Sequence, residues 1–216
     1  MHFEAISDPL WELLKKLDSL QELKNAYLGG GTALALQLGH RKSDDLDFFT
    51  SERFDDLSFR KNIPSIDLDT FVIHQTPNHT EMMIQSIKVD LITERIPLKF
   101  PVVPIHDEME NIAMADKKDI GRMKLLSIGS RGSKKDFVDL YCLTREAISL
   151  ESLLLMAMEE DRGIKYSRLL FLKGLIDFEE ADQEGSLIMI WNVAWDEVKN
   201  SLIGEVRKIA KKIQNE

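Results

Sequence analysis

Residues 27–50, YLGGGTALALQLGHRKSDDLDFFT, combine three consecutive glycines with two closely spaced aspartates, and this stretch decides the fold of the first half of the chain. Gly29 to Gly31 precede a segment, Thr32 to Leu38, that we expect to be helical. Glycines allow the backbone to approach a ligand closely, and the first N–H groups of a helix have no partner inside it. The pattern is typical of a phosphate site, although a plain strand-to-helix turn needs glycine as well.

The acidic segment that follows predicts a metal site. A strand over Asp45 to Phe49 places Asp45 and Asp47 on one face, about 7 Å apart, because strand side chains alternate. Such carboxylates repel each other, and strands disfavour aspartate. Mg²⁺ resolves both problems, since it takes oxygen ligands from carboxylates and substrate phosphates. The alternative is an exposed acidic edge strand, which the apolar neighbours Leu46, Phe48 and Phe49 disfavour.

A third carboxylate comes from IKVDLIT, residues 87–93, where Asp90 stands between two apolar residues. It either completes the metal site or points to solvent from its strand. Two aspartates on one strand and one on the next can hold two metal ions that clamp the oxygens of phosphoryl transfer. The glycine turn would then receive the triphosphate of a nucleoside triphosphate.

The composition is that of a globular protein, with 44% hydrophobic and 30% charged residues in a chain of 216. The longest apolar runs fall far short of the roughly 20 residues of a membrane span, so we expect no membrane association. We see no signal peptide, and the single cysteine, Cys142, excludes an internal disulfide framework. These features predict a cytoplasmic location.

The net charge of −9 argues against a protein that coats nucleic acid non-specifically. Basic residues nevertheless concentrate between residues 117 and 135. They are Lys117, Lys118, Arg122, Lys124, Arg131, Lys134 and Lys135. This segment is either one solvated helical face or a local surface for anions.

The remaining pattern predicts a mixed first half and a helical second half. We expect a helix from Pro9, a helix over residues 54–62, and strands over residues 68–75, 81–86 and 87–93. Helices are expected over residues 116–128, 133–145, 150–160 and 193–213. We therefore place a domain boundary after residue 110, between an α/β (α+β) domain, 1–110, with a mixed sheet and a helical domain, 111–216.

Two segments resemble the AbiEii/AbiGii-type nucleotidyltransferase toxins, a branch of the polymerase-β-like superfamily. GGGTALALQLGHRKSDDLDFF, residues 29–49, resembles the first motif of that family. DIGRMKLLSIGSRGSKKDFVDLY, residues 119–141, resembles its downstream motifs, a helical lysine followed by an Arg-Gly…Lys-Asp…Asp-Leu segment. One departure is that Gly31-Thr32 replaces the Gly-Ser of the superfamily, which puts participation of the hydroxyl in doubt.

The resemblance implies a nucleotidyltransferase-type fold, with the helical domain completing the active-site cleft. It also implies a set of functional residues. Nucleotide phosphates would contact Gly30, Gly31, Thr32 and Lys124; metal would bind Asp45, Asp47 and Asp90; and the catalytic set would be these aspartates with Lys124 and Asp136.

The residues of the second motif allow other interpretations when taken alone. Lys124 could extend from a helix flank to solvent. Asp136 and Asp139 share a helix face, so one could be a general base, a role we assign to Asp136, or both could form ion pairs. His40 and Arg41 fit the family's Gly-His-Arg signature and would equally suit the end of a helix.

The predicted function is Mg²⁺-dependent transfer of a nucleoside monophosphate from an NTP, with release of pyrophosphate. The resemblance implies a toxin of a bacterial toxin–antitoxin or phage-defence (abortive infection) system, acting on RNA such as tRNA, with an antitoxin protein as partner. The alternatives are a catalytically silent nucleotide-binding module, a partner-binding module, and a nucleotidyltransferase that modifies a protein or a small molecule.

Overall fold

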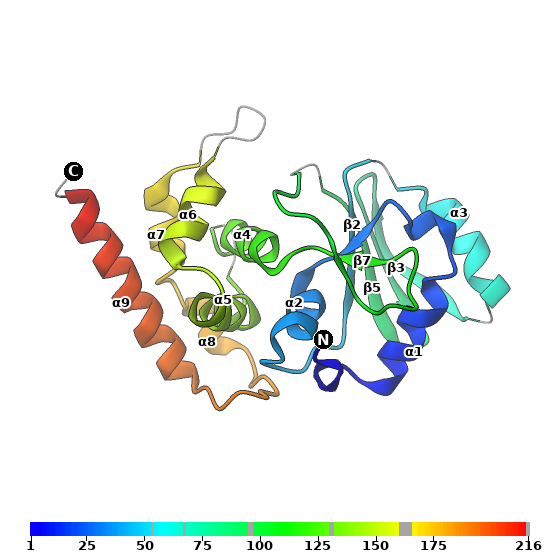
Figure 1. Ribbon diagram of the computed structural model, residues 1–216, viewed down its shortest axis with the longest axis horizontal. Coiled ribbons are helices and arrows are strands. Elements are labelled where there is room, and N and C mark those ends of the chain that lie inside the picture. Colours follow the sequence, from blue (N-terminus) through cyan, green and yellow to red (C-terminus); the bar gives the residue numbers. More distant parts are fainter. Residues whose placement is uncertain (53, 67, 95–96, 130–131, 160–165, 215–216) are drawn as a thin grey trace. The chain divides into compact units, whose positions relative to one another are not determined.

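The computed structural model describes residues 1–52, 54–66, 68–94, 97–129, 132–159 and 166–214 (Figure 1). The chain divides into two compact units, Met1–Asp116 and Lys117–Glu216. The first contains a mixed β-sheet and short helices, and the second is helical. The predicted fold class is confirmed. No helix in the described part of the chain is long and apolar enough to cross a membrane.

Within the described residues, seven strands form one sheet in the order β3-β4-β5-β2-β1-β7-β6. Strand β2 lies in the middle, where it pairs in parallel with β5 and antiparallel with β1. The pairs β3–β4, β4–β5 and β6–β7 are antiparallel, and β1–β7 is parallel. The strands are β1 (Tyr27–Leu28), β2 (Leu46–Thr50), β3 (Thr70–Thr76), β4 (His79–Ile84), β5 (Ile87–Thr93), β6 (Val103–Pro104) and β7 (Ala113–Met114).

The predicted strands agree with this sheet where the sequence is long enough to show the alternation of apolar and polar residues that is typical of a strand. Strand β5 has the predicted bounds, and β3 and β4 are each shifted by one or two residues and joined by a turn at Pro77-Asn78. Strands β6 and β7 were not predicted, because two-residue strands show no alternation.

In the described part of the first unit, three α-helices accompany the sheet: α1 (Asp8–Leu17), α2 (Gly30–Leu38) and α3 (Asp56–Asn62). Short 3₁₀ turns, η1 (Phe3–Ala5), η2 (Gln21–Leu23) and η3 (Ile63–Ile66), connect them. Helix α1 is capped by Ser7, whose Oγ accepts a hydrogen bond from the N–H of Leu10. Its leucines at helical spacing are buried, as predicted. Helix α2 packs on β2 and is buried along most of its length.

In the second unit, α4 contacts α5, α6 and α7, and the long helix α9 packs on α5 (Figure 1). A Cβ at Gly121 would overlap Leu143 and lie 3.0 Å from Leu153, so this glycine allows α4 to pack closely on α5 and α6. Helices α7 and α8 were not predicted, because each spans fewer than two turns. The helices are α4 (Lys117–Ile128), α5 (Lys134–Glu146), α6 (Leu150–Met158), α7 (Arg168–Gly174), α8 (Glu179–Gln183) and α9 (Trp195–Gln214).

Asp18 anchors the connection that leads into β7. Its carboxylate is 9% exposed and accepts hydrogen bonds from the backbone N–H groups of Glu110, Asn111 and Ile112 at 2.8 to 3.0 Å. The Asn111 side chain donates in return to the carbonyl of Asp18 at 2.6 Å. These contacts fix the end of α1 to residues more than 90 positions later in the chain, and they hold β7 in place beside β1.

We expect Asp18→Ala to lower the free energy of unfolding by about 2–4 kcal/mol, because three backbone donors lose a charged acceptor. Urea denaturation followed by circular dichroism measures the change. Glu12→Ala, which removes an exposed carboxylate from the same helix, should change stability by less than about 0.5 kcal/mol. Equal losses in the two variants would contradict the anchoring role of Asp18.

Candidate active site

The three glycines bring the backbone against the side chains of β2. A Cβ at Gly29 would lie 2.6 Å from the ring of Phe49, and one at Gly30 would overlap the carboxylate of Asp47. Gly30 also has a φ of +61°, in the left-handed region that favours glycine. The N–H of Gly29 donates to the carbonyl of Asp47 at 2.8 Å. The turn therefore packs on the strand that carries the predicted metal ligands.

Thr32 supports the turn from inside the protein. Its side chain is 1% exposed, its hydroxyl lies 2.8 Å from the hydroxyl of Ser43, and it donates to the carbonyl of Asp45. The hydroxyl thus holds the entry to β2, and a phosphate contact by Thr32 would come from its backbone N–H.

Arg41 connects the two ends of α2. The helix ends at Leu38, and Gly39 follows in the left-handed conformation with its N–H bonded to the carbonyl of Ala35. The guanidinium of Arg41 occupies the position that a side chain of Gly31 would take, and Arg41 is only 4% exposed. Arg41 therefore returns to the helix N-terminus and places a positive charge beside the glycine turn.

The central strands have one apolar face and one polar face. Leu46, Phe48, Met82, Val89 and Leu91 are at most 2% exposed and form the core on one side. Asp47 pairs with Asp90 across β2 and β5, and Asp90 pairs with Glu81 across β5 and β4. Because directly paired residues point to the same side, these carboxylates share the other face. The predicted proximity of Asp47 and Asp90 follows from this register.

Asp90 already has two side-chain partners on that face, a histidine and a lysine. Its Oδ1 lies 2.5 Å from His79 Nε2, and its Oδ2 lies 3.2 Å from Lys88 Nζ. Lys88 also lies 3.4 Å from Glu81 Oε1. Partial burial alone would lower the pKa of Lys88, but the carboxylates of Asp90 and Glu81 raise it above its ordinary value. Lys88 is therefore a cation at neutral pH.

The sequence alone gives little indication of this cluster, because the histidines show no metal-ligand spacing along the chain. The only local signal was the Lys-Val-Asp spacing of residues 88–90, which puts Lys88 and Asp90 on one face of a strand.

The carboxylates fit a divalent cation in part. Asp45 and Asp47 are half-buried, and Asp45 directly precedes β2. In the described residues, no group of three or more His, Cys, Asp or Glu side chains is placed to hold a metal ion. Two carboxylates beside the glycine turn nevertheless suit Mg²⁺, which takes oxygen ligands from one or two carboxylates and completes its shell with substrate phosphates and water.

In the second unit, Lys124 forms a buried triad with the two aspartates of α5. Its Nζ lies 2.7 Å from Asp136 Oδ1 and 2.8 Å from Asp139 Oδ2, and the side chains of Lys124 and Asp139 are 8% and 0% exposed. Burial alone would lower the pKa of Lys124, but Asp139 and Asp136 outweigh it and hold the pKa above its ordinary value. The interpretation of Lys124 as a lysine reaching into solvent is therefore wrong.

Asp136 also caps α5. The backbone N–H and the hydroxyl of Ser133 donate to Asp136 Oδ2, at 3.3 and 2.7 Å, in a capping box at the start of the helix. Both carboxylate oxygens of Asp136 thus accept from protein donors. The role of Asp136 as general base remains a prediction. The contacts in the structure are those of the alternative, an ion pair, and the cation of that pair is Lys124.

The basic segment 117–135 is not a continuous basic surface. Arg122 pairs with buried Asp119 at 3.1 Å and is 2% exposed. Lys134 donates to the carbonyls of Glu184 and Gly185 and lies 5.5 Å from the ring centre of Trp195. Arg122 and Lys134 are thus engaged inside the second unit, so they belong neither to a solvated helical face nor to an exposed surface for anions. Arg131 lies outside the described residues.

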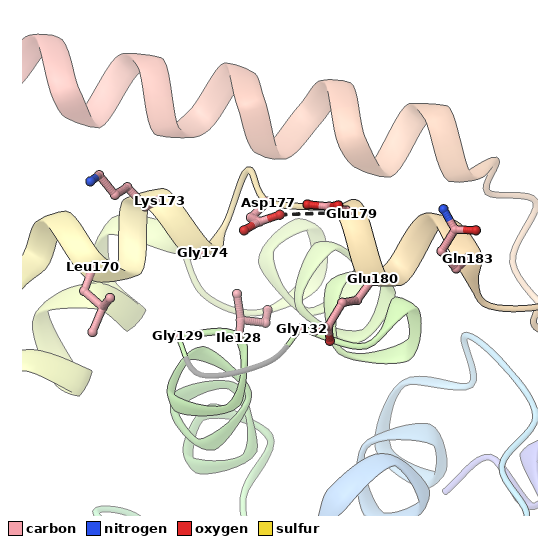
Figure 2. Close-up of a pocket in the computed structure, with 10 residues that line it drawn as sticks. All are labelled: Ile128, Gly129, Gly132, Leu170, Lys173, Gly174, Asp177, Glu179, Glu180 and Gln183. Atoms are coloured by element: carbon pink, nitrogen blue, oxygen red, sulfur yellow. Dashed lines mark hydrogen bonds between the residues drawn. The ribbon is translucent and has the colours of Figure 1, made fainter.

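A cavity of about 580 Å³ in the second unit does not suit a triphosphate (Figure 2). Its lining includes the carboxylates of Asp177, Glu179 and Glu180 and one cation, Lys173. Figure 2 shows these side chains on and around α7 and α8. Lys124 and Asp136 are not among the residues that line the cavity. The excess negative charge would repel an anion.

Comparison with known proteins identifies the family. The model of the AbiEii nucleotidyl transferase toxins, of type IV toxin–antitoxin systems, matches residues 12–215. An uncharacterised protein of Aquifex aeolicus is 36% identical over 176 residues, which cover 80% of this chain and 83% of the relative.

Two solved structures have a similar fold. JHP933 from Helicobacter pylori has a TM-score of 0.60 and 20% identity, and the match covers 97% of this chain and 95% of that one. MenT4, a nucleotidyltransferase toxin from Mycobacterium tuberculosis, has a TM-score of 0.54 and 18% identity, with 88% and 82% covered. The match of the family model over nearly the whole chain shows that this protein belongs to the AbiEii family of nucleotidyltransferase toxins.

Proposed function

We propose that this protein transfers a nucleoside monophosphate from an NTP to RNA, with tRNA as the acceptor class, and releases pyrophosphate. The reaction depends on Mg²⁺ and takes place in the cytoplasm. In this proposal the protein is the toxin of a phage-defence system and is neutralised by an antitoxin encoded with it.

The observation that carries this proposal is that the register of β2 and β5 sets Asp47 opposite Asp90 on the polar face of the sheet, and that Asp47 lies against the glycine turn. Carboxylates are placed together at the N-terminus of a nine-residue helix, and the first N–H groups of a helix have no partner inside it. Acidic side chains alone would repel a triphosphate, and a helix N-terminus alone would attract one. A divalent cation between them makes the two features compatible.

Asp45 and Asp47 would hold the cation, with Asp90 as a third ligand. When bound, Mg²⁺ supplies positive charge that neutralises the triphosphate and the developing charge of the transfer. The chain itself binds the phosphates through the backbone N–H groups of Gly30, Gly31 and Thr32. Arg41 strengthens the positive potential at this turn, because its guanidinium lies against Gly31.

Lys124 contributes positive charge toward the triphosphate in this proposal. Its ammonium is held by Asp136 and Asp139 and is protonated at neutral pH. The two aspartates orient the lysine side chain, so they act on the reaction through Lys124. A preorganised cation of this kind stabilises transition-state charge without reorganising.

RNA would contact the cations of the segment that remain accessible. Lys135 is exposed, and Lys117 and Lys118 are partly exposed. Few phosphate contacts predict modest affinity and a shallow dependence on salt. A small folded RNA with a single-stranded acceptor end suits such a limited surface better than a long duplex.

We expect Asp47→Asn to reduce transfer on the order of 10²-fold or more, because it removes a ligand charge while keeping the side-chain volume. Transfer is measured with α-³²P-labelled NTPs and total RNA. Asp44→Asn is the matched control, since Asp44 is exposed in the same segment, and it should retain activity. Near-normal transfer by Asp47→Asn would refute the metal assignment.

Lys124→Met should lower the free energy of unfolding by about 3–5 kcal/mol, because it leaves two largely buried carboxylates without their cation. Transfer at a temperature where the variant stays folded should also fall on the order of 10²-fold. Lys199→Met removes a less buried lysine that pairs with Asp182, and it should cost about 1 kcal/mol or less. A folded Lys124→Met protein with normal transfer would exclude the role at the triphosphate.

The double variant Lys118→Glu/Lys135→Glu should raise the KM for RNA by roughly three- to tenfold and leave the KM for NTP unchanged, because phosphate contacts are lost. Lys208→Glu, on the exposed side of α9, is the control for a charge reversal elsewhere. If a protein band takes up the labelled nucleotide while RNA stays unlabelled, the acceptor is not RNA.

A further inference from the structure

The carboxylate of Asp90 is directed away from the strand that carries Asp47. Its two contacts, His79 and Lys88, come from β4 and from β5 itself, whereas Asp47 lies on β2, on the opposite side of β5. The side chain of Asp90 is 5% exposed, so both of its oxygens depend on these partners and not on water. The strand register thus places Asp90 next to Asp47, where a third metal ligand is expected. Its side chain, however, contacts His79 and Lys88.

We propose that Lys88 and His79 are positioning residues that hold Asp90 toward β4, and that they release it when Asp90 joins Asp47 in binding a divalent cation. This inference rests on the proposed function, because it concerns the same metal site. In it, the ammonium of Lys88 competes with the metal ion for the carboxylate of Asp90.

Lys88 is suited to such an exchange because its surroundings differ from those of Asp90. The Lys88 side chain is 39% exposed, so its ammonium can move to water while remaining charged. Glu81, at 3.4 Å, offers it a second carboxylate on the same face. Asp90 has no comparable access to water, so its carboxylate can leave the ammonium of Lys88 only by binding another cation, the metal ion. The ammonium also repels a divalent ion that approaches the carboxylates.

The consequence is that the protein binds metal alone more weakly than its carboxylates would allow. Removal of Lys88 should tighten binding, because the metal then displaces one partner fewer and meets less positive charge. A merely structural ion pair predicts the opposite, since loss of Lys88 would then loosen the strands and weaken any site built on them. The direction of the change separates the two roles.

The test is a titration of the purified full chain with Mn²⁺ alone, with the free ion measured by electron paramagnetic resonance. Lys88→Met should bind Mn²⁺ about two- to fivefold more tightly than the wild type, the factor that corresponds to one partly exposed ion pair. Lys88→Arg, which keeps the charge, should bind within about twofold of the wild type. Lys15→Met removes the same charge from α1, where Lys15 pairs with Glu12, and should leave the affinity unchanged.

His79→Gln provides a second variant that removes the other partner of Asp90, and it should also tighten binding, which keeps the test decisive if Lys88→Met fails to fold. Unchanged or weaker binding in the folded variants overturns the inference. Asp47→Asn separates this failure from failure of the metal site. If Asp47→Asn abolishes binding and the variants at positions 88 and 79 change nothing, only the inference falls. If Asp47→Asn binds Mn²⁺ as the wild type does, or if no protein binds it, the proposed metal site falls as well.

Discussion

The chain can enter α2 and still pack that helix on β2 only because residues 29–31 have no side chains. The ring of Phe49, the carboxylate of Asp47 and the guanidinium of Arg41 occupy the three positions that Cβ atoms would need. The same constraint brings the N-terminus of α2 next to the acidic strand β2. Close packing and the proposed site for a phosphate and a metal ion therefore have one origin in this protein.

The position of β2 in the middle of the sheet extends this constraint to the neighbouring strands. Its register with β5 sets Asp47 beside Asp90, and the alternation of side chains sends Leu46 and Phe48 into the core. A slip of one residue would bury Asp47 and expose the apolar residues. The hydrophobic face thus enforces the register, and the register assembles the charged face on which the proposed chemistry depends.

The second unit uses buried charge in a different way. Lys124 of α4 lies between Asp136 and Asp139 of α5, so the two helices meet through ions as well as through apolar contacts. A second buried pair, Asp119 with Arg122, lies within α4 itself. Buried ion pairs contribute little net stability, but removal of one member is costly. The lysine that the family resemblance assigns to the triphosphate is therefore also part of the packing between two helices. Its environment keeps it charged and oriented, which a lysine exposed to solvent would not be.

The sequence by itself determined the α/β class, the long helices and strand β5, because periodicity and glycine chemistry are local properties. The face that Asp47 shares with Asp90 depends on the register of β2 against β5, and Asp45, expected on the same strand face as Asp47, directly precedes β2. The sequence did not reveal that Asp18 binds residues 110–112, or that Arg122 and Lys134 face inward. The contact of His79 with Asp90 was equally hidden, because it depends on the register of β4 against β5. A period tells which face of an element a residue occupies. Which charge it meets there depends on segments distant in the chain, and only the tertiary structure brings them together.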